Sequence, residues 1–111
     1  MCCTEKVDQG AATNMDNAVQ DDIWEWAKNT FPRSKTENHL NHLLKEVQEL
    51  KEDSRDILEY ADCLIILLHV ARSNGITVDM LNDAVKIKMD INKKRNWTEP
   101  DKDGAQHHIE E

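Results

Sequence analysis

The sequence has no excess of basic residues, and this absence argues against a protein that binds nucleic acid. Its 111 residues include 14 Lys and Arg against 22 Asp and Glu, for a formal net charge of -8. Gripping the backbone of DNA or RNA requires a basic surface, so we expect no nucleic-acid partner. A small phosphate ligand is still allowed, because divalent cations held by acidic residues would reverse the local charge.

Cysteine and long hydrophobic runs are also scarce. The cysteines at positions 2, 3 and 63 have the spacing of neither a disulfide framework nor a zinc site, which fits a reducing compartment. The longest apolar run, Cys63 to Leu68, is too short to span a bilayer, and the N-terminal residues lack the apolar segment of a signal peptide. We therefore expect a cytoplasmic protein with no membrane partner.

No segment has the alternating pattern of a β-strand, and the apolar residues recur instead at helical spacing. Pro32 closes the first helical segment, and Asn74-Gly75 stops the third. Ser34 followed by Glu37 forms a capping-box pattern at the start of the second segment. The first expected helix runs from near Asn14 to near Phe31, and the second from Ser34 to about Asp53. The third follows a cap at Asp53 or Ser54 and ends near Ser73, and the fourth follows a cap at Thr77 and ends near Asn96. This pattern predicts an all-α fold, a compact four-helix bundle.

Polar residues dominate both ends of the chain. We expect a mobile N-terminal leader at 1–13, an all-α domain at 14–97 and a polar C-terminal tail at 98–111. Hydrophobic residues make up only 39% of the sequence, so the core of a single chain is small. Self-association is the expected source of further buried surface, and we predict a homo-oligomer that completes the bundle.

Four acidic residues mark the candidate site. Glu59 and Asp62 stand in an apolar helix among neighbours such as Leu58 and Ile65, where an unpaired carboxylate is costly. One helix earlier, Glu46 and Glu49 repeat the same spacing of three residues, which places two side chains on adjoining helical turns. If the two helices pack together, the four carboxylates repel one another and raise their pKa values unless cations bind. Carboxylates alone favour hard ions, chiefly Mg²⁺ with Mn²⁺ as the alternative.

The last helix turns from apolar to cationic along its inward stripe, where Lys88, Asn92 and Arg95 follow Leu81 and Val85. These three side chains could hold a negatively charged, hydrogen-bonding ligand against the metal, or they could simply form salt bridges with the acidic helices.

Histidines and tryptophans near these segments have ordinary structural interpretations. We expect His39, His42 and His69 to be polar neighbours whose hydrogen bonds are satisfied, rather than metal ligands. Trp24 and Trp26 are expected to fill the core or an interface.

Together, three motifs resemble the MazG-like all-α nucleoside triphosphate pyrophosphohydrolases. They are Glu46-Val-Gln-Glu49-Leu, Leu58-Glu59-Tyr-Ala-Asp62 and the segment from Lys88 through Asn92 and Arg95 to Trp97. The similarity covers about residues 37–97, and flanking segments look like the short members that act on deoxynucleotides, of the dATP/dGTP or dCTP type.

The resemblance implies hydrolysis of a (deoxy)nucleoside triphosphate to the monophosphate and pyrophosphate. Glu46, Glu49, Glu59 and Asp62 would be the catalytic and metal-binding residues, with Mg²⁺ as cofactor. Lys88, Asn92 and Arg95 would bind the substrate. Members of the family are typically homodimers or homotetramers.

Two other classes of function stay open at the level of sequence. One is a non-catalytic helical oligomerisation or interaction module, in which the carboxylates pair with Lys88 and Arg95 as structural ion pairs. The other is a bundle that senses or stores metal without consuming nucleotide.

Overall fold

The computed structural model describes residues 14–97 together with Pro100 and Gly104, and the regular elements in this part of the chain are all helices. The predicted leader at 1–13 and most of the predicted tail lie outside these residues. The helices are α1 (Asn17–Thr30), α2 (Thr36–Glu52), α3 (Ile57–Ser73) and α4 (Val78–Lys94). The predicted all-α class is therefore confirmed, with four helices and no strand between residues 14 and 97.

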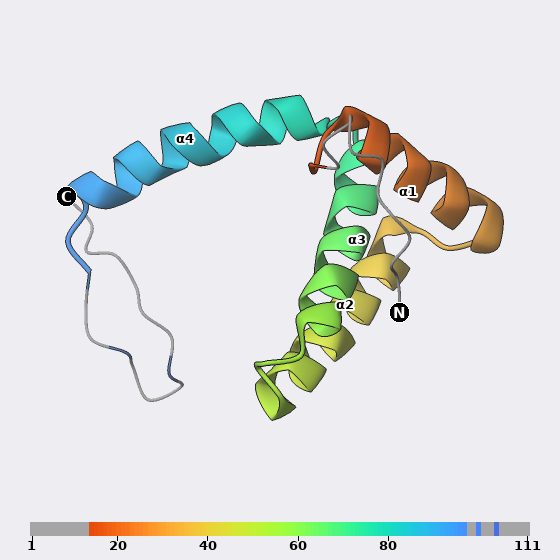
Figure 1. Ribbon diagram of the computed structural model, residues 1–111, viewed down its shortest axis with the longest axis horizontal. Coiled ribbons are helices and arrows are strands. Elements are labelled where there is room, and N and C mark those ends of the chain that lie inside the picture. The colour runs from red at the N-terminus through yellow and green to blue at the C-terminus, as the bar shows by residue number, and fades with distance from the viewer. Residues whose placement is uncertain (1–13, 98–99, 101–103, 105–111) are drawn as a thin grey trace. The chain divides into compact units, whose positions relative to one another are not determined.

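The chain divides into two compact units, Met1–Asp79 and Met80–Glu111. In the first unit, α2 and α3 form an antiparallel hairpin and α1 packs against α3 (Figure 1). Buried apolar side chains of this unit are Ala27, Ile66, Leu68 and Val78. This small core agrees with the low hydrophobic content of the sequence.

The helix ends follow local rules with two corrections. Asp16 caps α1 by accepting the Val19 N–H at 2.9 Å, and Gly75 adopts φ +79° in the turn after α3, where it stops the helix as predicted. The Ser34 capping box is wrong, because the Ser34 N–H bonds to Phe31 O in the preceding turn and α2 begins two residues later. The cap of α3 is Asp56, which accepts the Leu58 N–H at 3.0 Å.

Gln20 ties three segments of the first unit together. Its side chain has no exposed surface and donates to Leu68 O at 3.1 Å and to Ile76 O at 3.0 Å. It also accepts the N–H of Val78, the first residue of α4, at 2.9 Å. Asn17 similarly accepts the Asp79 N–H at 3.1 Å. Residues of α1 thus satisfy amides of the first turn of α4, which have no partner within their own helix.

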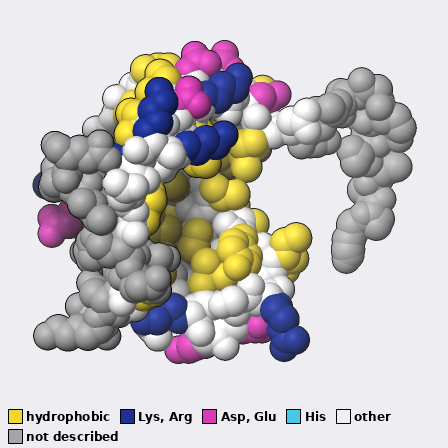
Figure 2. All heavy atoms as spheres, turned by 90° about the vertical axis from the view of Figure 1, so that its left-hand side faces the viewer, with side chains coloured by type: hydrophobic (Ala, Val, Ile, Leu, Met, Phe, Trp, Pro, Cys, Tyr) yellow, Lys and Arg dark blue, Asp and Glu magenta, His cyan; other side chains and the backbone are white. Residues whose placement is uncertain are grey.

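Many large apolar side chains are exposed in the single chain, as the yellow side chains in Figure 2 illustrate. On the α2–α3 hairpin they include Leu44 at 68%, Ile57 at 76% and Leu58 at 72% exposed. Where exposed apolar side chains form a large patch, that patch often marks an interaction site.

In the second unit, the part of α4 from Met80 onward carries exposed Val85, Ile87 and Met89. Within the described residues, no single helix is both long and apolar enough to cross a membrane, and only α3 and α4 taken together, with the break between them, reach such a length and composition.

Candidate functional site

Three carboxylates meet where α2 and α3 run side by side. One oxygen each from Glu46, Glu49 and Glu59 lie within 4.8 Å of one another. Glu46 and Glu49 are one turn apart near the end of α2, and Glu59 is in the first turn of α3. An antiparallel hairpin places the start of the second helix beside the end of the first, so the connection of Asp53–Asp56 brings these side chains together.

Glu59 is the buried member of this carboxylate cluster. Glu59 is only 8% exposed, and its Oε2 atom has no hydrogen-bond partner within the described residues. The pKa of Glu59 is raised from 4.5 to about 8, first by a hydrogen bond with Glu46 and then by burial, a hydrogen bond with Glu49 and the charges of both neighbours. An orphaned carboxylate oxygen facing two more carboxylates fits a hard divalent cation, which would supply the missing positive charge.

Asp62 occupies a different environment from Glu59. It lies one turn further along α3, is exposed and is outside the group of three whose oxygens converge. The expectation that both acidic residues of α3 are buried is therefore wrong for Asp62, because its side of α3 remains open in the single chain. Asp62 and Glu46 instead both line the same pocket.

The carboxylate cluster affects two neighbouring residues, Cys63 and His42. The thiol of Cys63, which is half-buried and free, has a raised pKa, first because of burial and then because of nearby carboxylates: Glu46, Glu59, Asp62 and Glu49. His42 Nε2 lies 3.0 Å from Glu46 Oε2, so a ring N–H can donate to this carboxylate and hold it in place.

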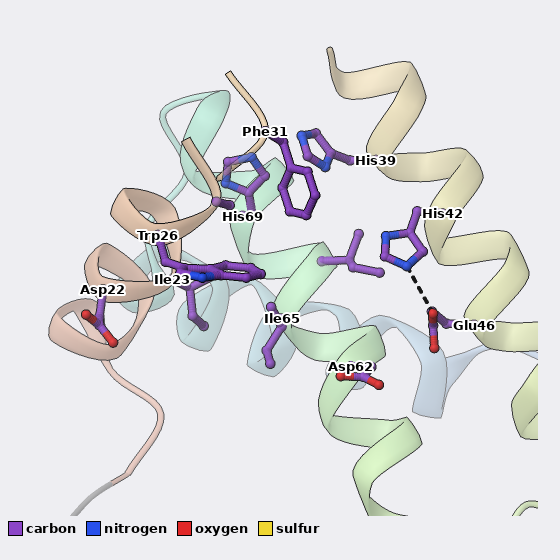
Figure 3. A pocket seen from close by; sticks show the side chains of 12 residues that line it. Asp22, Ile23, Trp26, Phe31, His39, His42, Glu46, Asp62, Ile65 and His69 are labelled. Atoms are coloured by element: carbon purple, nitrogen blue, oxygen red, sulfur yellow. Dashed lines mark hydrogen bonds and ion pairs between the residues drawn. The ribbon is translucent and has the colours of Figure 1, made fainter. Parts of the chain in front are cut away.

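A pocket of about 400 Å³ adjoins the carboxylate cluster. Figure 3 shows Trp26 and Phe31 on one side of this pocket, with His42 and Glu46 projecting from α2 on the other. The cavity volume is in the range of small-molecule sites. The full lining comes from α1, α2, α3 and the turn after α1: Asp22, Ile23, Trp26, Ala27, Phe31, His39, His42, Glu46, Asp62, Ile65, Ile66 and His69.

Aromatic rings form a chain along this pocket. Trp26 and Phe31 are edge-to-face at 5.6 Å between centroids, Phe31 and His39 at 6.1 Å, and His39 and His69 at 4.5 Å. Trp26 is 54% exposed, so it does not fill the core of the single chain, and its expected place in an interface stays a prediction. Trp24 is instead held between cations, with Lys28 Nζ at 3.7 Å and Arg72 Cζ at 4.4 Å from its ring.

His69 departs from the sequence-based expectation of a satisfied polar neighbour. It is 7% exposed, and its Nδ1 has no hydrogen-bond partner among the described residues. Burial lowers the pKa of His69, and the adjacent His39 lowers it further. Burial also lowers the pKa of His39, with a smaller effect from His42. Both rings are therefore neutral near pH 7.

The sequence contained a signal for this histidine pair that residue-by-residue reasoning missed. His39 precedes Glu46 by seven residues, and His69 follows Asp62 by seven residues. Seven residues are about two helical turns, so each histidine returns to the face of its helix that carries the acidic residue. In an antiparallel hairpin both displacements run in the same direction, which brings the two histidines opposite each other.

Lys88 and Asn92 lie on α4, and Arg95 follows its last residue, all in the second unit. Lys88 is exposed, whereas Asn92 and Arg95 are half-buried. The backbone carbonyl of Asn92 accepts the indole N–H of Trp97 at 3.1 Å. Binding of substrate by these three residues stays a prediction.

Comparison with known protein families finds a match over most of the chain. The profile of the dATP/dGTP pyrophosphohydrolase family matches residues 19–111. A dATP/dGTP diphosphohydrolase of Cyanophage S-2L is 34% identical over 93 residues, which are 82% of this chain and 85% of that protein.

Two further relatives are longer proteins from phages of Salmonella. A dATP/dGTP diphosphohydrolase of Salmonella phage PMBT28 is 38% identical over 92 residues, or 82% of this chain and 30% of that protein. The Eaa protein of Salmonella phage P22 is 42% identical over 60 residues, or 53% of this chain and 19% of that protein. This chain thus spans less than a third of either protein.

A solved structure has the same fold. The Cyanophage S-2L MazG-like pyrophosphohydrolase, bound to dGDP and three catalytic Mn²⁺ ions per active site, superimposes with a TM-score of 0.68 at 33% sequence identity. The match covers 84% of this chain and 95% of the other.

Proposed function

The chain belongs to the dATP/dGTP pyrophosphohydrolase family and is a nucleoside triphosphate pyrophosphohydrolase, and from this premise we propose that it hydrolyses dATP and dGTP with Mg²⁺ as cofactor. The products are the deoxynucleoside monophosphate and pyrophosphate. The observation that carries the proposal is the buried Glu59 carboxyl group, whose Oε2 has no hydrogen-bond partner among the described residues, beside Glu49 and beside Glu46, which also lines a pocket of about 400 Å³.

In this proposal Glu46, Glu49, Glu59 and Asp62 hold the divalent metal. Divalent ions, when bound, would neutralise the charge of the triphosphate. They would also lower the pKa of a bound water, so that it can lose a proton and attack the phosphate. The similar S-2L enzyme holds Mn²⁺, which makes Mn²⁺ the alternative to Mg²⁺. The carboxylate oxygens of this chain are suited to either ion.

The remaining catalytic work falls to side chains already placed in the site. Glu46 or Glu49 accepts the proton of the attacking water. His42 donates a hydrogen bond to Glu46 across 3.0 Å and keeps that carboxylate turned toward α3. Glu59, buried between the helices, fixes the inner edge of the site.

The pocket beside the carboxylates receives the deoxynucleoside. Its two ends differ in chemistry, because Glu46 and Asp62 lie at one end and the aromatic chain of Trp26, Phe31 and His39 leads to the other. We place the phosphates at the acidic end with the metal and the base along the aromatic rings, which offer stacking surfaces. Lys88, Asn92 and Arg95 contact the nucleotide as positively charged and amide donors.

Self-association completes the enzyme in this proposal, as a homodimer or homotetramer. The exposed Leu44, Ile57 and Leu58 of the α2–α3 hairpin are the surface that a second copy covers. The free thiol of Cys63 and the deoxynucleotide substrate are consistent with a cytoplasmic enzyme.

The alternative of a non-catalytic module with structural ion pairs is not favoured. It needs cations on the carboxylates, whereas Glu59 Oε2 has no hydrogen-bond partner within the described part of the chain. The named functions of the S-2L and PMBT28 relatives are also enzymatic.

A panel of nucleoside triphosphates with pyrophosphate detection tests the proposed function. We expect Mg²⁺-dependent release from dATP and dGTP, abolished by Glu59→Gln and retained by the control Glu37→Gln, which changes an exposed glutamate in the first turn of α2. Absence of pyrophosphate with every nucleotide, in Mg²⁺ and in Mn²⁺, would reject it.

A further inference from the structure

The feature that the catalytic chemistry leaves unused is the edge-to-face pair of His39 and His69 in the wall of the pocket. The ring centroids are 4.5 Å apart and the rings are inclined at 77°. His69 is buried, and its Nδ1 has no hydrogen-bond partner among the described residues. An unpaired buried nitrogen costs free energy, and in a pocket wall it is a group that a ligand can satisfy.

The unpaired Nδ1 of His69 is buried, but rotation of the ring can move it to the opposite edge. Rotation of an imidazole by 180° about its Cβ–Cγ bond exchanges Nδ1 with Cδ2, and this torsion has a broad, roughly two-fold profile. His69 lines the pocket with His39 beside it, and such a rotation would place Nδ1 where Cδ2 now lies.

The position of the pair fits the base rather than the phosphates. His39 and His69 are each about two helical turns, on the order of 10 Å, from Glu46 and Asp62 along their helices. The two imidazoles are therefore about two helical turns from the acidic end of the pocket, where we place the metal and the triphosphate.

Adenine and guanine make opposite demands at this end. Both present the N7 acceptor, but adenine carries an amino donor at position 6 where guanine carries a carbonyl acceptor. A fixed donor or a fixed acceptor would favour one of them. A neutral imidazole offers one donor and one acceptor, and the proton can occupy either nitrogen.

We propose that His39 and His69 read the edge of a purine base, with His69 changing tautomer so that one pocket accepts both dATP and dGTP. This inference rests on the proposed function. With its N–H toward the base, His69 donates to O6 of guanine. With the bare nitrogen toward the base, it accepts from the amino group of adenine. The change moves one proton from one ring nitrogen to the other through water, so the charge of the ring is unchanged.

The test compares kcat/KM for dATP, dGTP and the triphosphate of 2′-deoxynebularine, a purine with hydrogen at position 6. Wild type should prefer both natural substrates over the nebularine analogue by about tenfold, the size of one good base contact. His69→Phe keeps a flat ring without nitrogen, so all three substrates should become equal, through a higher KM for dATP and dGTP with little change in kcat. Glu37→Gln serves as the control and should retain the wild-type preference.

A second variant separates base reading from packing. His69→Gln retains a donor and an acceptor that exchange places by amide rotation, so it should restore most of the preference that His69→Phe removes. The same comparison with His39→Phe tests the partner ring. Equal kcat/KM of wild type for dATP and the nebularine analogue would overturn the inference even if no variant folds. An unchanged preference in His69→Phe would overturn it too. Both outcomes leave pyrophosphate release from dATP intact, which distinguishes them from failure of the proposed function.

Discussion

Gln20 and Val78 are joined by a hydrogen bond of 2.9 Å, in which the side chain of a residue on α1 accepts the first backbone N–H of α4. The sequence separation is 58 residues. Gln20 thereby satisfies a free N–H at the start of α4, as an N-cap side chain usually does from the neighbouring sequence. Its amide NH₂ also donates to Leu68 O and Ile76 O, on either side of the turn after α3. The turn that ends α3 and starts α4 is therefore held by α1.

Replacing Gln20 with Leu should destabilise the protein by about 2–4 kcal/mol, because buried backbone groups lose their partners while the volume is nearly kept. The measurement is a urea or thermal unfolding curve. Asn17→Ala, which removes exposed hydrogen bonds to Asp79, is the matched control and should cost about 1 kcal/mol. Equal melting of Gln20→Leu and wild type would contradict the role of Gln20 in holding this turn.

Glu59→Gln should raise thermal stability in chelator while it abolishes turnover, with activity falling at least about 100-fold. In the metal-free protein Glu59 must keep a proton to avoid repulsion from Glu46 and Glu49, whereas the amide is neutral at every pH and can donate to either of them. Asp62→Asn should raise the melting temperature less, because Asp62 is exposed and outside that group. Differential scanning calorimetry in EDTA, beside a pyrophosphate assay in Mg²⁺, measures both effects. A melting temperature of Glu59→Gln below that of wild type in EDTA would contradict the repulsion.

The stability of the metal-free protein should fall as pH rises from about 4.5 to about 8. The ordinary pKa of Glu59 is 4.5 and the folded state raises it to about 8, so over this range the unfolded chain ionises while the folded one keeps its proton. The folded state then binds more protons than the unfolded state, which makes stability decrease with pH. Below pH 4.5 this effect is fully favourable, and above about pH 8 it is lost.

Melting curves of wild type and Glu59→Gln across this pH range, in EDTA, isolate the contribution of Glu59. The difference between the two proteins should grow with pH, and saturating Mg²⁺ should diminish it for wild type. Parallel curves for the two proteins would show that Glu59 does not titrate in this window.

Leu58→Lys should weaken self-association. Leu58 is 72% exposed in the single chain, and a charge placed there would be desolvated wherever a second copy covers the hairpin. Light scattering after size-exclusion chromatography should show oligomers for wild type and Glu37→Gln, and smaller species for Leu58→Lys. A monomeric wild type at micromolar concentration would reject the predicted homo-oligomer.

Local patterns were sufficient for much of the fold. Helical spacing predicted the four helices, and Asn74-Gly75 marked the end of α3, where Gly75 takes a positive φ. Helix starts were less accurate. Asp53, Ser54 and Asp56 all satisfy the capping rules before α3, and α2 follows Lys35, a residue that these rules do not favour. Spacing on the helix also identified Glu46, Glu49 and Glu59, whose oxygens the hairpin brings within 4.8 Å.

The sequence by itself determined the class of fold and the family, because helical periodicity and the acidic motifs are local properties of the chain. Tertiary structure alone decided which acidic residue of α3 is buried. Glu59 and Asp62 have similar apolar neighbours in sequence, but only Glu59 faces the carboxylates of α2. The pairing of His39 with His69 and the cap that Gln20 provides to Val78 likewise depend on how helices are rotated against one another, and no single helix encodes that rotation.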